Sequence, residues 1–244
     1  PLGGADPAPG DLHGKTGLDG ATLPEPAARP HALSAEKAML HHARADRIGI
    51  VALGPLTNLA QVLSANPGFA ARIAWISLMG GSTAVGNSTA VAEFNLHCGP
   101  KTADIVFRSG VPIRMAGLNV TRQVGVGEEE IAYLRSLGGR TALTFADLFE
   151  FCLERSRTIF GLAKASLHDA CAVVPLVHPE LIGFRKAAVA IELMGRHTRG
   201  MTVCDFRGVA LKDLQAIRPS GEPNAEVAVE VDGAEIVRRV FDAI

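Results

Sequence analysis

The sequence of this 244-residue chain predicts an α/β fold in which helices flank a mainly parallel sheet. Short apolar runs typical of buried strands alternate with longer segments whose apolar residues recur at helical spacing. Glycine and proline mark most of the boundaries between these segments. Because 48% of the residues are hydrophobic and only 20% are charged, the chain can form a substantial core, and we expect a single domain over residues 1–244.

The element patterns start after a Gly- and Pro-rich stretch, residues 1–33, which we expect to be loop. In the first half of the chain we predict a helix at 35–45, a strand at 47–53 covered on both faces, a helix within 54–67, a strand with a glycine turn at 73–81, a helix at 99–110 and a strand at 111–118. In the second half we predict helices near 127–136, 141–160 and 169–177, strands at 187–193, 201–206 and 225–232, and a closing helix at 233–244. This order implies right-handed crossovers between parallel strands.

Composition excludes several classes of protein. The formal net charge is -1 and the basic residues are scattered, which argues against a nucleic-acid or anionic-membrane surface. No apolar run approaches the roughly 20 residues of a membrane-spanning helix. The four cysteines form no zinc-spaced cluster, so we expect reduced thiols and a cytoplasmic protein.

Ligands of parallel sheets bind at the carboxyl ends of the strands, so the residues after each predicted strand are the candidates for a site. These segments, 54–58, 79–95 and 118–121, hold more Asn, Thr and Gly than core packing needs. They contain neither the glycine fingerprint of dinucleotide-binding folds nor a P-loop, so a phosphate cradle of either kind is not expected.

A histidine and an aspartate, His168 and Asp169, are adjacent where a helix is predicted to begin. Asp169 has an ordinary explanation, because a carboxylate at a helix N-terminus caps the orphan N–H groups. His168 alone is more often a structural, hydrogen-bonded histidine than a catalytic one. The alternative is that the pair forms half of an active site.

A second candidate group follows a glycine turn and contains Asn87, Glu93, Phe94 and Asn95. On an extended segment, Glu93 and Asn95 would point the same way and Phe94 the opposite way. A carboxylate and an amide on one face can bind adjacent sugar hydroxyls or a cation, although such residues also serve plain turn geometry. Thr57 lies in a tight turn whose backbone carbonyls suit a hard cation such as Ca²⁺.

Several of these motifs, in this order, resemble those of the inosine-uridine preferring nucleoside hydrolases. The resemblance is carried by the sequences VALGPLTNLA (51–60), MGG (79–81), AEFN (92–95), GLNVT (117–121), SLHDACAV (166–173) and ELMGRHTRGMTVCDFRG (192–208). It implies a Rossmann-like α/β fold, cleavage of the N-glycosidic bond of ribonucleosides by water, a bound calcium ion and a homo-oligomer, either dimer or tetramer.

The resemblance also implies roles for individual residues. Asp169 matches a calcium-binding carboxylate, and Thr57 matches a position whose backbone carbonyl binds the ion. Glu93, Asn95 and Asn87 match residues that hold the ribose hydroxyls, with Met79 near the sugar. His168 matches the histidine that assists the leaving base, and His13 matches a histidine near the base. Leaving-group assistance suits an imidazole, and ribose contacts suit an oxocarbenium-like transition state.

The chain also departs from the family pattern. The aspartate-rich cluster that supplies most of the calcium carboxylates is not found, and the first strand–helix–strand unit of the fold would precede Pro1. Asn119 and Gly99 occupy positions where aspartate is common. We therefore expect weak calcium binding and keep two functions open: a ribonucleoside hydrolase, or a non-catalytic relative that binds a nucleoside or ribose. A fold remnant that acts only in assembly is a third, weaker reading.

Overall fold

A six-stranded sheet forms the centre of the computed structural model, which describes residues 13–208 and 221–244. The strand order is β1-β2-β3-β8-β6-β7. β1, β2, β3 and β8 are parallel, β6 is antiparallel to β8, and β7 is antiparallel to β6. The strands are β1 (Ile48–Ala52), β2 (Ile73–Met79), β3 (Ile113–Ala116), β6 (Ile182–Ile191), β7 (Thr202–Asp205) and β8 (Ala225–Val231), and a separate antiparallel pair is formed by β4 (Gly125–Val126) and β5 (Ala165–Ser166). The predicted α/β fold is therefore confirmed.

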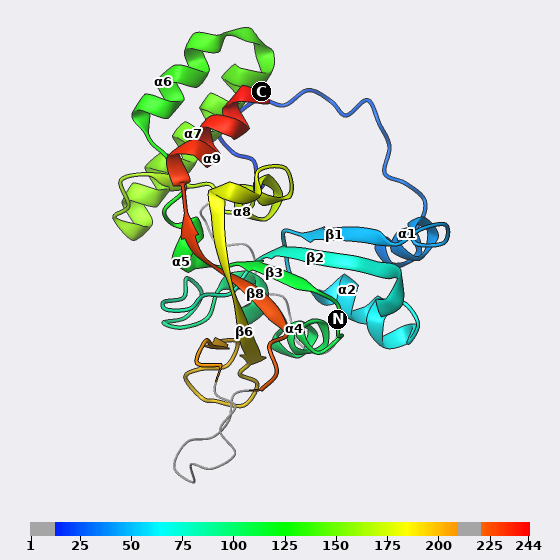
Figure 1. The fold of residues 1–244 in the computed structure, drawn as a ribbon. Coiled ribbons are helices and arrows are strands. Elements are labelled where there is room, and N and C mark those ends of the chain that lie inside the picture. Colours follow the sequence, from blue (N-terminus) through cyan, green and yellow to red (C-terminus); the bar gives the residue numbers. More distant parts are fainter. Residues whose placement is uncertain (1–12, 209–220) are drawn as a thin grey trace.

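Helices cover the sheet in separate groups (Figure 1). α2 and α4 pack with the aliphatic residues of β1, β2 and β3 in one large apolar cluster, while α8 lies on the other side of β2. α6, α7 and α9 form a second apolar cluster beyond the end of β8. The helices are α1 (Ala35–His42), α2 (Thr57–Ala65), α3 (Phe94–Cys98), α4 (Pro100–Phe107), α5 (Leu118–Thr121), α6 (Glu128–Leu137), α7 (Gly139–Phe160), α8 (Ala170–Val173) and α9 (Gly233–Asp242), with short 3-10 turns η2 (Ala70–Arg72), η3 (Val174–Leu176) and η4 (Pro179–Leu181).

The alternation along β2 explains how both faces are used. Ile76 and Leu78 belong to the α2–α4 cluster, whereas the Ser77 hydroxyl donates to the carbonyl of Ala172 in α8, at 2.6 Å. β1 differs from its prediction because its burial alternates and Val51 is 37% exposed. One face of β1 is therefore exposed to solvent, although its continuous apolar sequence predicted burial of both faces.

Three other elements differ from the sequence prediction. β6 begins at Ile182 rather than 187, because the charged pair Arg185 and Lys186 lies within the strand and conceals its apolar pattern. The Arg185 guanidinium lies 5.0 Å from the centre of the Phe206 ring, so it packs without leaving solvent. The helix expected at 169–177 is instead α8 followed by η3, and α3 forms where an extended segment was expected.

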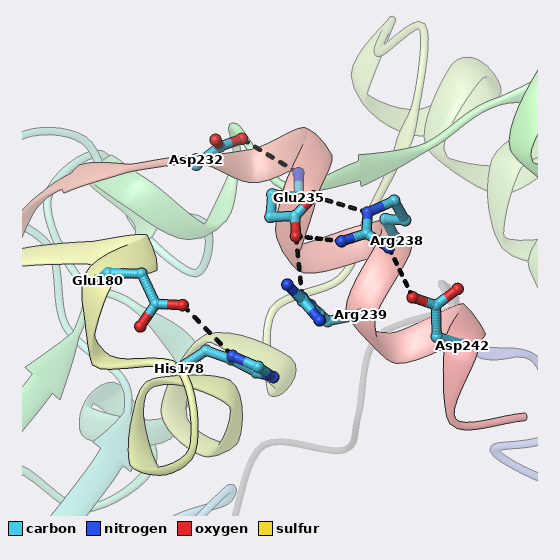
Figure 2. Close-up of polar contacts among 7 residues, drawn as sticks. All are labelled: His178, Glu180, Asp232, Glu235, Arg238, Arg239 and Asp242. Carbon is cyan, nitrogen blue, oxygen red and sulfur yellow. Dashed lines mark hydrogen bonds and ion pairs between the residues drawn. The ribbon is translucent and has the colours of Figure 1, made fainter.

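The closing helix α9 is amphipathic, as predicted. Ile236, Val237 and Phe241 are buried, and Asp232 caps the helix by accepting from the Glu235 amide at 3.1 Å. On the exposed side, Glu235 binds Arg238 and Arg239, and Arg238 also binds Asp242 (Figure 2). A neighbouring pair joins His178 to Glu180 at 3.3 Å. The pairs along α9 stabilise that helix only modestly.

In the part of the chain that the structure describes, no helix has both the length and the apolar character needed to cross a bilayer.

Candidate active site

The candidate residues gather at the carboxyl ends of β1, β2 and β3, as expected for a parallel sheet. The Asn95 side-chain amide donates to the Met79 carbonyl at 3.0 Å and to the Leu53 carbonyl at 3.4 Å. Met79 ends β2, and Leu53 follows directly after β1. Asn95 therefore bridges the ends of two neighbouring strands, and its side-chain orientation is fixed by backbone atoms.

Glu93 is the N-cap of α3 and is only 2% exposed. Its carboxylate accepts from the backbone amides of Asn95 at 2.9 Å, Gly81 at 3.0 Å and Leu96 at 3.3 Å. Burial raises the pKa of Glu93 and the nearby Asp169 carboxylate raises it further, while the three amides act in the opposite direction. Glu93 is thus a buried cap in a short helix, which corrects the extended geometry expected for residues 93–95.

Gly81 makes this arrangement possible at the end of β2. Its φ is +71°, a left-handed conformation that favours glycine, and a Cβ there would lie 2.8 Å from the Thr202 methyl group. The Gly81 amide donates to Glu93, and its carbonyl accepts from the Leu118 amide at 2.9 Å. The glycine turn therefore connects the β2 end to both α3 and α5.

The remaining residues of this segment have supporting contacts. The exposed Asn87 uses Oδ1 to accept from the amide of Phe94, the first residue of α3, at 2.8 Å. The Met79 side chain is buried in a small apolar cluster with Leu118 and Ala172. Its sulfur lies 3.6 Å from the Asn95 amide nitrogen. Met79 and Asn87 therefore hold Asn95 and α3 in place, whatever else they bind.

Asp169 precedes α8, but its side chain makes no helix-capping hydrogen bond. The ordinary explanation for an aspartate at this position therefore does not apply. Asp169 keeps exposed surface, yet partial desolvation raises its pKa, and its charge raises the pKa of both Glu93 and Cys171. Two carboxylates from distant parts of the sequence thus lie close enough to repel each other.

His168 lies beside Asp169 and is half-buried. Its Nδ1 is 2.7 Å from the hydroxyl oxygen of Thr121, at the end of α5. Desolvation lowers the pKa of His168 to about 4, and the positive charges of Arg122 and His13 contribute in the same direction. The imidazole is therefore neutral at neutral pH and offers one ring nitrogen as a donor and one as an acceptor.

His13 and Thr57 have different relations to this group. The exposed His13 has its Nδ1 3.9 Å from the Cys152 sulfur, and its charge acts on both His168 and Asp169. Thr57 begins α2, and among residues 13–208 and 221–244 no hydrogen bond joins it to Asn95 or Asp169. The backbone carbonyl that does contact Asn95 is that of Leu53, which the sequence reasoning missed.

The other residue missed is Thr121, although the segment 118–121 was recognised as following a strand. A threonine in a short apolar helix has no distinguishing pattern of its own. Its role becomes visible only when the fold brings it to His168, 47 positions further along the chain.

The described residues do not form a complete calcium site. Within residues 13–208 and 221–244, no three His, Cys, Asp or Glu side chains are grouped so that they could hold a metal ion. Calcium takes 6–8 oxygen ligands. Both oxygens of Glu93 already accept from backbone amides, which leaves the Asp169 carboxylate as the open acidic ligand of the pair. We therefore assign no step to a bound calcium ion.

Comparison with known proteins agrees with this geometry. The family model described as inosine-uridine preferring nucleoside hydrolase matches residues 1–238. This chain belongs to that family. The resemblance predicted from the separate motifs is therefore confirmed.

Among curated relatives, a protein named pyrimidine-specific ribonucleoside hydrolase RihA from Shewanella woodyi is 39% identical over 93% of this chain and 71% of its own length. The protein of the same name from Escherichia coli is 38% identical over 96% of this chain and 73% of its own length. Among solved structures, a plant nucleoside hydrolase superposes with a TM-score of 0.86 at 28% identity, covering 98% of this chain and 74% of that one. A purine-preferring ribonucleoside hydrolase from Gardnerella vaginalis superposes with a TM-score of 0.83 at 29% identity, covering 94% of this chain and 71% of that one.

Proposed function

We propose that this chain hydrolyses the N-glycosidic bond of ribonucleosides, releasing the free base and ribose. The observation that carries the proposal is the position of Asn95, Glu93 and Asp169 around one end of the sheet, with His168 beside them. Membership of the nucleoside hydrolase family and the names of the relatives support it.

The ribose would bind to Asn95, Glu93 and Asp169. The Asn95 amide nitrogen is held by two carbonyls, so its Oδ1 is directed as an acceptor for a sugar hydroxyl. Glu93 can accept a second hydroxyl through the lone pairs that its amide donors leave over. As the bond to the base breaks, the sugar becomes oxocarbenium-like, and carboxylates nearby stabilise that positive charge more than they stabilise the ground state.

The base would leave with the help of His168. Because the ring is neutral at neutral pH, His168 assists by donating a hydrogen bond to the departing base rather than by carrying a stored proton. His13 lies close enough to His168 for its charge to be felt, which supports a place for it near the base. Phe94 and Asn87, at the start of α3, are proposed at the edge of the sugar site.

Pyrimidine nucleosides are the proposed substrates. Two curated relatives with 38% and 39% identity are named pyrimidine-specific ribonucleoside hydrolases. The structural relative named as purine-preferring is more distant, at 29% identity. We therefore expect uridine to be cleaved faster than inosine.

Calcium assistance, a homo-oligomer and a cytoplasmic location stay predictions. The open carboxylate of Asp169 is the described side chain best suited to a hard cation, and a carbonyl such as that of Leu53 or, as the sequence suggested, Thr57 would be its partner. Asp169→Asn should weaken calcium binding measured by calorimetry, and unchanged affinity would remove Asp169 from the ligand set.

A non-catalytic nucleoside- or ribose-binding protein is the second candidate. It is favoured by one observation, the incomplete set of acidic ligands among the described residues. Such a protein would bind ribose through Asn95, Glu93 and Asn87 without turnover.

One experiment separates the two functions. The full chain is incubated with uridine or inosine, with and without added calcium, and free base is measured by chromatography. Release that disappears in Asn95→Leu but persists in the exposed control Glu154→Ala supports the hydrolase. Calorimetric binding of ribose without release of base would replace that proposal with the binding function. If the chain neither releases base nor binds ribose, the site has neither of the two roles.

A further inference from the structure

We infer that Thr121 is a positioning residue that holds the His168 ring in the tautomer with hydrogen on Nε2, so that His168 presents a donor to the leaving base. The inference rests on the proposed hydrolase function and adds a residue to it. Thr121 acts only through His168 in this scheme and contacts no substrate itself.

The geometry places Thr121 firmly. Its side chain is completely buried, and its amide donates to the Gly117 carbonyl at 3.1 Å. Its own carbonyl accepts from the Val124 amide at 3.2 Å. The hydroxyl is therefore carried by backbone that is hydrogen-bonded on both sides, at the C-terminal end of α5. From this position it reaches His168 Nδ1 at 2.7 Å, a short distance for a hydroxyl–nitrogen hydrogen bond.

The direction of this hydrogen bond follows from the hydroxyl's lack of another partner. Among the described residues, the Thr121 hydroxyl has one hydrogen-bond partner, which is His168 Nδ1. If Thr121 accepted from Nδ1–H, its own hydrogen would be buried without an acceptor, which costs about 1–3 kcal/mol. If Thr121 donates, its hydrogen is satisfied and only acceptor capacity is left over, which proteins tolerate more often. Nδ1 is then the acceptor, and the ring hydrogen must lie on Nε2.

The other ring nitrogen is available for a ligand. Among the described residues, the buried side-chain nitrogen or oxygen atom without a partner is His97 Nδ1. His168 Nε2 is not such an atom and has no hydrogen-bond partner among the described residues, so it keeps some solvent-accessible surface. The Nε2–H group is therefore left without an acceptor among the described residues, while Nδ1 is held by the Thr121 hydroxyl.

A purely structural role for Thr121 predicts a different result. If Thr121 only filled space, an isosteric valine would change stability but would affect all substrates equally. If Thr121 sets the tautomer, valine allows both tautomers, and the loss falls on substrates whose leaving group needs a hydrogen-bond donor. A nucleoside base needs one, whereas the 4-nitrophenolate released from 4-nitrophenyl riboside does not.

The kinetic test compares Thr121→Val, Thr121→Ser and the wild-type chain on uridine and on 4-nitrophenyl riboside. We expect Thr121→Val to lower kcat for uridine about tenfold with little change in KM, the scale set by one orienting hydrogen bond. The activated riboside should lose less than about twofold, and Thr121→Ser should recover most of the uridine activity. In a His168→Ala background, Thr121→Val should cause no further loss, because it acts through that ring.

The tautomer is tested separately by nitrogen NMR of histidine-labelled protein, with His168 assigned from a His168→Gln variant. Wild type should show Nδ1 as an unprotonated acceptor and Nε2 as protonated, and Thr121→Val should show averaging of the two. A wild-type ring protonated on Nδ1 overturns the inference even if the valine variant does not fold. Equal losses on both substrates, or an additive loss in the His168→Ala background, also overturn it. If wild type releases neither uracil from uridine nor 4-nitrophenolate from the riboside, the proposed hydrolase function fails, and the NMR result still decides the tautomer.

Discussion

Replacing Glu93 with alanine should destabilise the protein through the backbone amides that the carboxylate holds. Glu93 caps α3 and also accepts from Gly81 at the end of β2, so one side chain connects a helix to a glycine turn. The substitution removes the acceptor of three N–H groups in a place where the side chain itself is 2% exposed. Water cannot replace all three contacts at once without rearrangement of the turn.

The magnitude follows from these contacts. Loss of a helix cap costs about 0.5–2 kcal/mol. The Gly81 amide is outside the helix, and leaving it unsatisfied adds about 1–3 kcal/mol. Burial raises the pKa of Glu93, which means that the native state pays to desolvate the charge, and alanine relieves that cost. We therefore expect a net loss of about 2–3 kcal/mol, a large part of the ~5–15 kcal/mol typical of a domain.

The assay is urea denaturation at neutral pH, followed by circular dichroism. Glu154→Ala is the matched control, because Glu154 is an exposed glutamate within α7 and its replacement should change the free energy of unfolding by less than about 0.5 kcal/mol. An equal effect of the two substitutions would refute the assignment of Glu93 as a buried cap.

Three further predictions can be checked in parallel. Asn95→Leu removes the amide that binds the carbonyls at the ends of β1 and β2, and we expect kcat/KM for uridine to fall by about 10–100-fold in steady-state assays; an unchanged value would exclude Asn95 from the site. Phe107→Ala should cost about 3–5 kcal/mol in urea denaturation because Phe107 is almost fully buried, whereas the exposed Phe160→Ala should cost little. The ion pair with Arg238 lowers the pKa of Glu235 to about 2, so its stabilisation is complete above the ordinary value of 4.5 and is lost as the pH falls from there toward 2. Glu235→Gln should accordingly be less stable than wild type at pH 7, and the difference should shrink as the pH falls from 4.5 through 2; a difference that keeps its size over that range would contradict this linkage.

The sequence predicted the fold well where the apolar pattern was simple. The runs that became β2, β3 and β8 are dominated by buried aliphatic residues, and their periodicity identifies them directly. It was less informative for β6, whose Arg185 and Lys186 lie in a strand because aromatic packing and pairing with β8 accommodate them. The open face of β1 was also missed, since periodicity does not reveal what lies above a strand.

For the site, the motifs indicated candidate residues but not how the fold holds them. Glu93 and Asn95 were expected to share a face of an extended segment, but a short helix presents them because Glu93 can cap it. The roles of Leu53 and Thr121 depend on a backbone carbonyl and a single hydroxyl placed by long-range contacts. Neither kind of atom leaves a signature in one sequence, so such partners are found only once the chain is folded.

Ser82, the residue after Gly81, connects the candidate site to β7, a strand that contributes no side chain to the site. The Ser82 amide donates to the Thr202 hydroxyl at 2.9 Å, and that hydroxyl donates back to the Ser82 carbonyl at 2.6 Å, across 120 positions of sequence. Opening of the β6–β7 hairpin would release this clamp and, with it, the turn that supports the Glu93 carboxylate. The rate at which the Ser82 amide exchanges its hydrogen with solvent should therefore follow the stability of the hairpin, and remote substitutions in β7 should change catalysis by loosening the loop rather than by altering any group that meets the substrate.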